Sequence, residues 1–109
     1  MGEVHFVKLS HEWRMTFPER FSNNLIRPFK EVLSELPTRN RPFRGVLAVD
    51  LSRTTYIDMY ALGMLLLLKE RAEKVVLRAS HPDVLAVFDY AHFDEIFEIE
   101  RTDAVNPAV

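Results

Sequence analysis

The stretch at residues 45–72, GVLAVDLSRTTYIDMYALGMLLLLKERA, decides how the rest of this chain can fold. Its continuously apolar start, residues 46–49, predicts a strand covered on both faces, as in a parallel sheet under helices. The apolar residues 61–68 predict a helix, and we expect most of its girth to be buried. The polar loop between strand and helix is where we expect the function to lie.

The segments before this stretch predict a hairpin and one helix. Two alternating patterns predict an antiparallel strand pair with a turn at residues 10–12: Val4, Phe6 and Leu9, then Trp13, Met15 and Phe17. Apolar residues at helical spacing between positions 25 and 36 predict an amphipathic helix capped by Ser22, Asn23 or Asn24. Pro28 predicts that this helix starts late or is kinked, because a proline past the first turn loses a backbone hydrogen bond.

The segments after this stretch complete an alternation of strands and helices. Residues 75–77 predict a buried strand, and Ser80-His81-Pro82-Asp83 predicts a helix start with the proline at the first helical position. Residues 96–99 predict a closing edge strand. The order β-β-α-β-α-β-α-β predicts an α/β fold with a mixed, mostly parallel sheet flanked by helices. We expect one domain at residues 1–102 and a flexible C-terminal tail at residues 103–109.

Composition limits the class of protein. The chain has 109 residues, 48% of them hydrophobic and 28% charged, which is typical of one globular domain. It has no cysteine, so disulfides, thiolate metal sites and a cysteine nucleophile are excluded. No signal peptide is visible, and the longest apolar run, residues 64–68, is far shorter than the roughly 20 residues of a membrane span. We therefore expect a cytoplasmic protein without membrane insertion.

Charge is unevenly distributed along the chain. The formal net charge of −2 predicts no general attraction to nucleic acid. Residues 19–44 nevertheless hold six basic side chains against three acidic ones, and residues 83–103 hold seven acidic side chains against one arginine. These segments are either the solvated faces of a scaffold or surfaces that steer a charged partner.

Sequence motifs for catalysis are missing. The chain has only three glycines and contains no Gly-x-Ser-x-Gly, Gly-x-x-x-x-Gly-Lys or Gly-x-Gly-x-x-Gly motif. Its four histidines show no metal-ligand spacing. We therefore expect neither an enzyme nor a cofactor or metal. The alternative is a catalytic group built from Asp50, Asp58 and a distant histidine.

Residues 50–63, DLSRTTYIDMYALG, resemble the STAS family, the domains of bacterial anti-sigma factor antagonists. In that family a strand ending in Asp-Leu-Ser leads to an aromatic, an aliphatic and an Asp, followed by a Ser and a second small residue, then Gly or Ala, Leu and Gly. Residues 82–99, PDVLAVFDYAHFDEIFEI, are similar to the family's penultimate helix and last strand. The resemblance implies a STAS-like domain that binds an anti-sigma factor, which is also a serine kinase, and thereby frees a sigma factor.

The resemblance implies which residues bind the partner. They lie at the strand-helix junction: Ser52, Arg53, Thr54, Thr55, Asp58, Met59, Tyr60, Leu62 and Gly63. Asp58 is the family's acidic residue and the expected helix N-cap, and Leu62 and Gly63 correspond to its helix-packing pair. From its place at the strand end, we expect Asp50 to fasten the loop by accepting backbone N–H bonds. Ser52, Thr54 and Thr55 are alternatively ordinary turn residues.

The chain departs from the family at the phosphorylated position. The serine that the kinase phosphorylates in regulated members is Met59 here, which has no hydroxyl. Tyr60 has one, but it projects farther from the backbone than that of serine, so we expect no phosphorylation there. The function implied is a regulatory binding module for an anti-sigma factor or kinase-like protein, held near the unphosphorylated state. The alternative is a STAS-like subunit of a bacterial lipid ABC transporter that docks on its ATPase through the same helix end.

Overall fold

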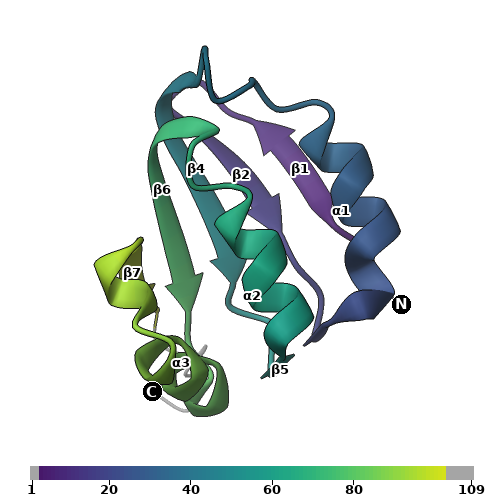
Figure 1. The fold of residues 1–109 in the computed structure, drawn as a ribbon, viewed down its shortest axis with the longest axis vertical. Helices are drawn as coiled ribbons and strands as arrows, with labels where there is room; N and C mark the ends of the chain where they lie inside the picture. Colours follow the sequence, from purple (N-terminus) through teal and green to yellow (C-terminus); the bar gives the residue numbers. More distant parts are fainter. Residues whose placement is uncertain (1–2, 103–109) are drawn as a thin grey trace.

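A five-stranded sheet forms the back of the molecule (Figure 1). The computed structural model describes residues 3–102, so the expected tail at residues 103–109 lies outside the described residues. The strand order is β1-β2-β4-β6-β7, in which β1 and β2 are antiparallel and the other neighbours are parallel. The bounds are β1 (His5–Lys8), β2 (Glu12–Thr16), β4 (Phe43–Leu51), β6 (Ala72–Ala79) and β7 (Glu98–Arg101). The mixed, mostly parallel α/β fold is thus confirmed.

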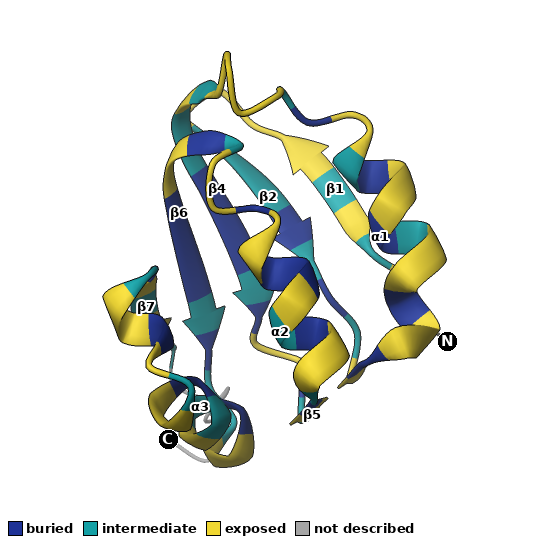
Figure 2. Cartoon of the chain, in the orientation of Figure 1, coloured by how far each residue is buried: buried dark blue, intermediate teal, exposed yellow. Residues whose placement is uncertain are grey.

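Three helices pack on one face of this sheet (Figure 1). They are α1 (Ile26–Leu33), α2 (Met59–Leu66) and α3 (Pro82–Tyr90), with short 3-10 turns η1 (Asn23–Leu25) and η2 (Phe93–Glu95). Alternate strand residues such as Met15, Val49 and Leu77 face the helices and join Phe29 and Leu65 in one buried cluster. This cluster is the core, and α2 lies across its middle (Figure 2).

The start of α1 shows how the chain accommodates Pro28. The helix begins at Ile26, so Pro28 is its third residue, where a backbone N–H has no partner inside the helix. The predicted late start is therefore confirmed. The predicted caps are wrong: the N-cap is Leu25, which makes no side-chain cap bond, because the turn η1 takes up Asn23 and Asn24 and separates Ser22 from the helix.

The start of α3 agrees with its sequence signal. Pro82 is the first helical residue, and Asp83 lies in the first turn. The cap is His81, whose Nδ1 accepts a hydrogen bond from the backbone N–H of Asp83 at 3.1 Å. The predicted closing strand is present as β7 at the sheet edge beside β6, but it begins at Glu98, two residues later than expected.

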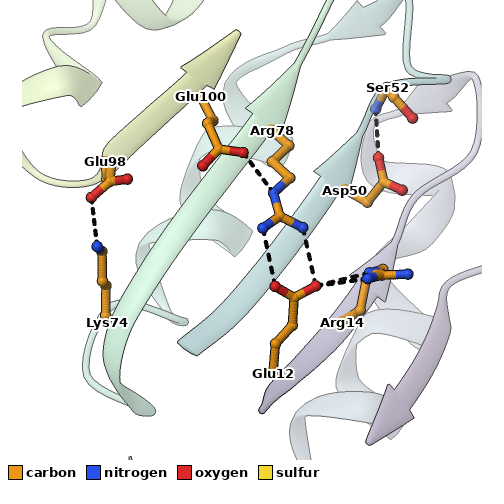
Figure 3. Close-up of polar contacts among 8 residues, drawn as sticks. All are labelled: Glu12, Arg14, Asp50, Ser52, Lys74, Arg78, Glu98 and Glu100. Atoms are coloured by element: carbon orange, nitrogen blue, oxygen red, sulfur yellow. Dashed lines mark hydrogen bonds and ion pairs between the residues drawn. The ribbon is translucent and has the colours of Figure 1, made fainter. Parts of the chain in front are cut away.

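The second face of the sheet carries charged side chains in place of helices (Figure 3). Ala48 and Val76 face this side, because they are register partners of each other and of Arg14. Ala48 is 0% and Val76 3% exposed. The strand is thus covered on both faces, as predicted, but helices cover only one of them, and the other face carries the charged layer of Glu12, Arg14 and Arg78.

Glu12 is the centre of that charged layer. Both of its carboxylate oxygens accept bonds from Arg78, each at 3.0 Å, and one also accepts from Arg14 at 2.8 Å (Figure 3). Arg78 donates in addition to Glu100 at 2.9 Å. The hydrogen bonds from Arg78, and then those from Arg14, lower the pKa of Glu12, and the bond to Glu12 raises the pKa of Arg78. The layer ties together strands β2, β6 and β7.

Candidate functional site

The loop after β4 is fastened at its first residues. One carboxylate oxygen of Asp50 accepts a hydrogen bond from the backbone N–H of Ser52 at 2.9 Å (Figure 3). The hydroxyl of Ser80 donates to the carbonyl of Ser52 at 3.0 Å. The role expected for Asp50 is confirmed, and the loop is tied to the segment that follows β6.

A second, two-stranded parallel sheet holds the rest of the loop. Its strands are β3 (Arg20–Phe21) and β5 (Tyr56–Ile57). Next to it, the N–H of Thr55 donates to the carbonyl of Glu19 at 2.9 Å, and the hydroxyl of Thr54 donates to the carbonyl of Pro18 at 2.8 Å. Thr54 is 0% exposed. Its expected place on the partner-binding surface is therefore wrong, because its side chain anchors the loop from inside.

Asp58 caps α2, as predicted. One carboxylate oxygen accepts from the backbone N–H of Ala61 at 3.2 Å, and the other accepts from the hydroxyl of Ser22. Ser22 is 2% exposed. The start of α2 is thus joined to the segment before η1, a connection that the sequence analysis missed because the two residues are 36 positions apart.

One side of α2 is apolar and exposed. We call it the α2 stripe, and it consists of Met59, Tyr60, Gly63, Leu66 and the C-cap Leu67. Met59 is 84%, Tyr60 59%, Leu66 45% and Leu67 53% exposed. At 3.6 residues per turn these positions share one side of the helix, and the buried residues share the opposite side (Figure 2). The expectation that most of α2 is buried is therefore wrong, because the core covers only one of its sides.

The Leu-Gly pair in α2 is split between these two sides. Leu62 is half-buried and packs against the core. Gly63 is exposed, and a Cβ added to it would meet no atom within 4 Å. The expected packing role of Gly63 is therefore wrong within this chain. The glycine lies in the middle of the α2 stripe.

Several of the polar side chains named as an alternative centre make local contacts. Within residues 3–102, no group of three His, Asp or Glu side chains is placed to hold a metal ion. Asp50 and Asp58 accept loop and cap hydrogen bonds. Among the histidines, His81 caps α3, and His92 lies 3.6 Å from Glu95. What the junction offers a partner is a firmly held loop beside an exposed apolar helix face.

Fold and site together define a small α/β domain whose central helix carries an exposed apolar side. Residues 5–99 match the family described as "Mlab, STAS domain", and the chain belongs to this family. No helix within residues 3–102 is long and apolar enough to cross a membrane.

Proteins similar to this chain include a curated relative and a solved structure. A STAS-domain containing protein of Pseudomonas aeruginosa (strain UCBPP-PA14) is 38% identical over 55 residues, which cover 47% of this chain and 54% of the relative. The matched part thus spans about half the length of that relative. The crystal structure of an anti-sigma factor antagonist from Mycobacterium paratuberculosis superposes with a TM-score of 0.73, covering 94% of this chain and 87% of the other. At 14% identity this likeness shows the fold alone.

Proposed function

We propose that this STAS domain is a non-enzymatic regulatory module that acts in the cytoplasm by binding an anti-sigma factor or a related kinase-like protein. The contact consists of the α2 stripe together with Ser52, Arg53 and Thr55 of the preceding loop. The observation that carries the proposal is Met59, a large apolar side chain that is 84% exposed at the start of a helix capped by Asp58. Exposed apolar side chains gathered on one face mark interaction surfaces more often than scattered single ones do.

The residues at the junction also argue against control by phosphorylation, because the expected position has no hydroxyl. The first turn of α2 has free backbone N–H groups, which favour negative charge, and a phosphate there would add about −1.5 to −2 charges to the surface. Met59 offers no hydroxyl for this reaction, and the hydroxyl of Thr54 is buried. A methionine adapts its shape to an apolar partner. The contact is therefore persistent, and it is controlled through the partner or through the amount of the partner present.

A second function is favoured by the same methionine. A subunit that stays docked on the ATPase of a lipid ABC transporter needs no release step, and Met59 provides none. Both functions use the same surface of α2, so they differ in the identity of the partner alone.

Purification with the natural partner distinguishes the two functions. The tagged protein is recovered from the cells that produce it, and its stoichiometric partner is identified. A kinase-like ATPase domain supports the first function, and a transporter ATPase supports the second. The dissociation constant is then compared for the wild type, Met59→Ser and Met59→Glu.

We expect Met59→Glu to weaken binding by more than tenfold, about 1.4 kcal/mol, because it places an unpaired charge in a desolvated contact. Met59→Ser removes apolar area without adding charge, so its loss is smaller. Val7→Glu is the matched control, because Val7 is 51% exposed on the charged face of the sheet and should not affect binding. An unchanged affinity of Met59→Glu would exclude the α2 stripe as the interface.

A further inference from the structure

The shape of the α2 stripe and the charged residues near it indicate what kind of partner it binds. Resting on the proposed function, we infer that the partner contributes an amphipathic helix that crosses α2 at Gly63 and carries acidic side chains beside its apolar face. The partner element is therefore a helix with acidic flanks, seated along the full length of α2.

Gly63 is the first reason for a helix. A glycine inside a helix is about 1 kcal/mol less favourable than alanine. Nothing in this chain requires it, because a Cβ at Gly63 would lie in open space. Glycine does allow another backbone to approach closely. Its place four residues after Met59 and four before Leu67 makes a notch in the middle of an apolar ridge, which suits a crossing helix.

The length of the ridge is the second reason. Met59 and Tyr60 form one end and Leu66 and Leu67 the other, with about 1.5 Å of rise per residue between them. The apolar ridge is thus about 10 Å long, which matches two turns of a partner helix with apolar residues at every third or fourth position. The side of α2 itself offers an extended peptide no strand edge to pair with, because the backbone groups there are bonded within the helix.

The charged residues near the α2 stripe indicate the sign of the charge on the partner. At the loop end, the guanidinium of Arg20 lies 4.3 Å from the centre of the Tyr56 ring, and Arg53 is exposed. At the other end, a hollow of about 200 Å³ has a lining in which leucines meet basic side chains: Arg39, Leu66, Leu67, Lys69, Glu70 and Arg71.

Basic side chains outnumber acidic ones in the hollow beside Leu66 and Leu67. Arg39 contacts Glu70 at 3.8 Å, which partly neutralises that pair. Lys69, two residues after Leu67, has no acidic contact among the described salt bridges. Acidic flanks on the partner complement these charges, whereas a second copy of this chain would bring two basic borders together.

An anionic membrane surface would satisfy the same charges, but it does not suit Gly63. Helices that lie on membranes gain affinity from buried apolar area, and a central glycine supplies none. The observations therefore favour a protein helix over a lipid surface.

Site-specific photo-cross-linking in the producing cells tests the inference. A benzophenone amino acid is incorporated at position 59, 67 or 7, and the cross-linked peptides are sequenced. We expect positions 59 and 67 to label the same protein, within one helical segment bordered by Asp and Glu. Position 7 should not label that protein. Labelling of a loop, a strand or a lysine-rich segment would overturn the inference.

The pattern of labelling separates this inference from the proposed function. If position 59 labels a kinase-like protein or an ATPase and position 67 labels nothing, the inference fails and the proposed function stands. If neither position labels a protein, both fail. If the wild type floats with phosphatidylglycerol vesicles and Leu67→Glu does not, the inference of a partner helix is overturned in favour of a lipid surface.

Two pairs of variants give a quantitative check with the identified partner. Gly63→Leu should weaken binding at least tenfold without loss of thermal stability, because its side chain fills the notch and its Cβ has room among the described residues. Lys69→Glu should lower the association rate constant at low salt, and Lys30→Glu on α1 is its exposed control. Full affinity of Gly63→Leu would contradict the crossing helix. Equal association rate constants for the two lysine variants would contradict its acidic flanks.

Discussion

Asp58→Ala should destabilise the domain through two separate losses. The backbone N–H of Ala61 loses its cap, now 3.2 Å away, which costs about 1 kcal/mol. The hydroxyl of Ser22, in a side chain only 2% exposed, loses its acceptor, which costs about 1–3 kcal/mol. We expect a total of about 2–4 kcal/mol, nearer the lower end because Asn23 Oδ1, 3.4 Å from that hydroxyl, is a second acceptor.

Urea denaturation of a set of variants checks this reasoning. Asp58→Asn keeps an oxygen for the cap and should lose less than about 1 kcal/mol. Since Ser22 and Asp58 share one hydrogen bond, Ser22→Ala and Asp58→Ala should be non-additive by more than about 0.5 kcal/mol. Asp50→Ala is a control that removes a single exposed hydrogen bond. A loss of less than about 0.5 kcal/mol in Asp58→Ala, or strict additivity with Ser22→Ala, would refute the account of this junction.

Three further variants test separate parts of the structure. Gly63→Ala should raise the free energy of unfolding by about 0.5–1 kcal/mol, and a decrease in a thermal melt would show that the added methyl is not in open space. Thr54→Val should lower it by about 1–3 kcal/mol, because the carbonyl of Pro18 loses its donor; a neutral result in urea would contradict the anchoring role. The lowered pKa of Glu12 means that its contribution to stability is present above its ordinary value of 4.5 and is lost as the pH falls through the lowered value. Glu12→Gln should therefore flatten the acid side of the stability–pH curve, and an unchanged acid side would contradict that contribution.

Much of the fold follows from local sequence signals. Alternation at Phe6 and Met15 predicted the hairpin, and Pro82 predicted the start of α3, because each pattern depends on a few neighbouring residues. The charged face of the sheet could not be predicted in this way. Ala48 and Val76 are apolar like core residues, and only the strand register shows that they lie on the same face of the sheet as Arg14.

The site was predictable in part. The cap at Asp58 followed from its place before an apolar helix. The bond from Ser22 and the β3–β5 pairing join distant residues through very short segments, which carry no periodicity. Leu66 and Leu67 belong to an unbroken apolar run that winds fully around the helix, so some of the run had to face outward wherever the core covers one side alone.

The rate of methionine oxidation tests directly whether the α2 stripe is the docking surface. Within residues 3–102, Met15 is 0% and Met64 7% exposed, whereas Met59 is 84% exposed. Dilute hydrogen peroxide should therefore oxidise Met59 rapidly in the free protein, and peptide mass spectrometry reports each methionine separately. We predict that a stoichiometric partner slows the oxidation of Met59 by at least about tenfold, because a side chain buried in an interface is shielded from solvent. An equal oxidation rate of Met59 in the free protein and in the complex would contradict the claim.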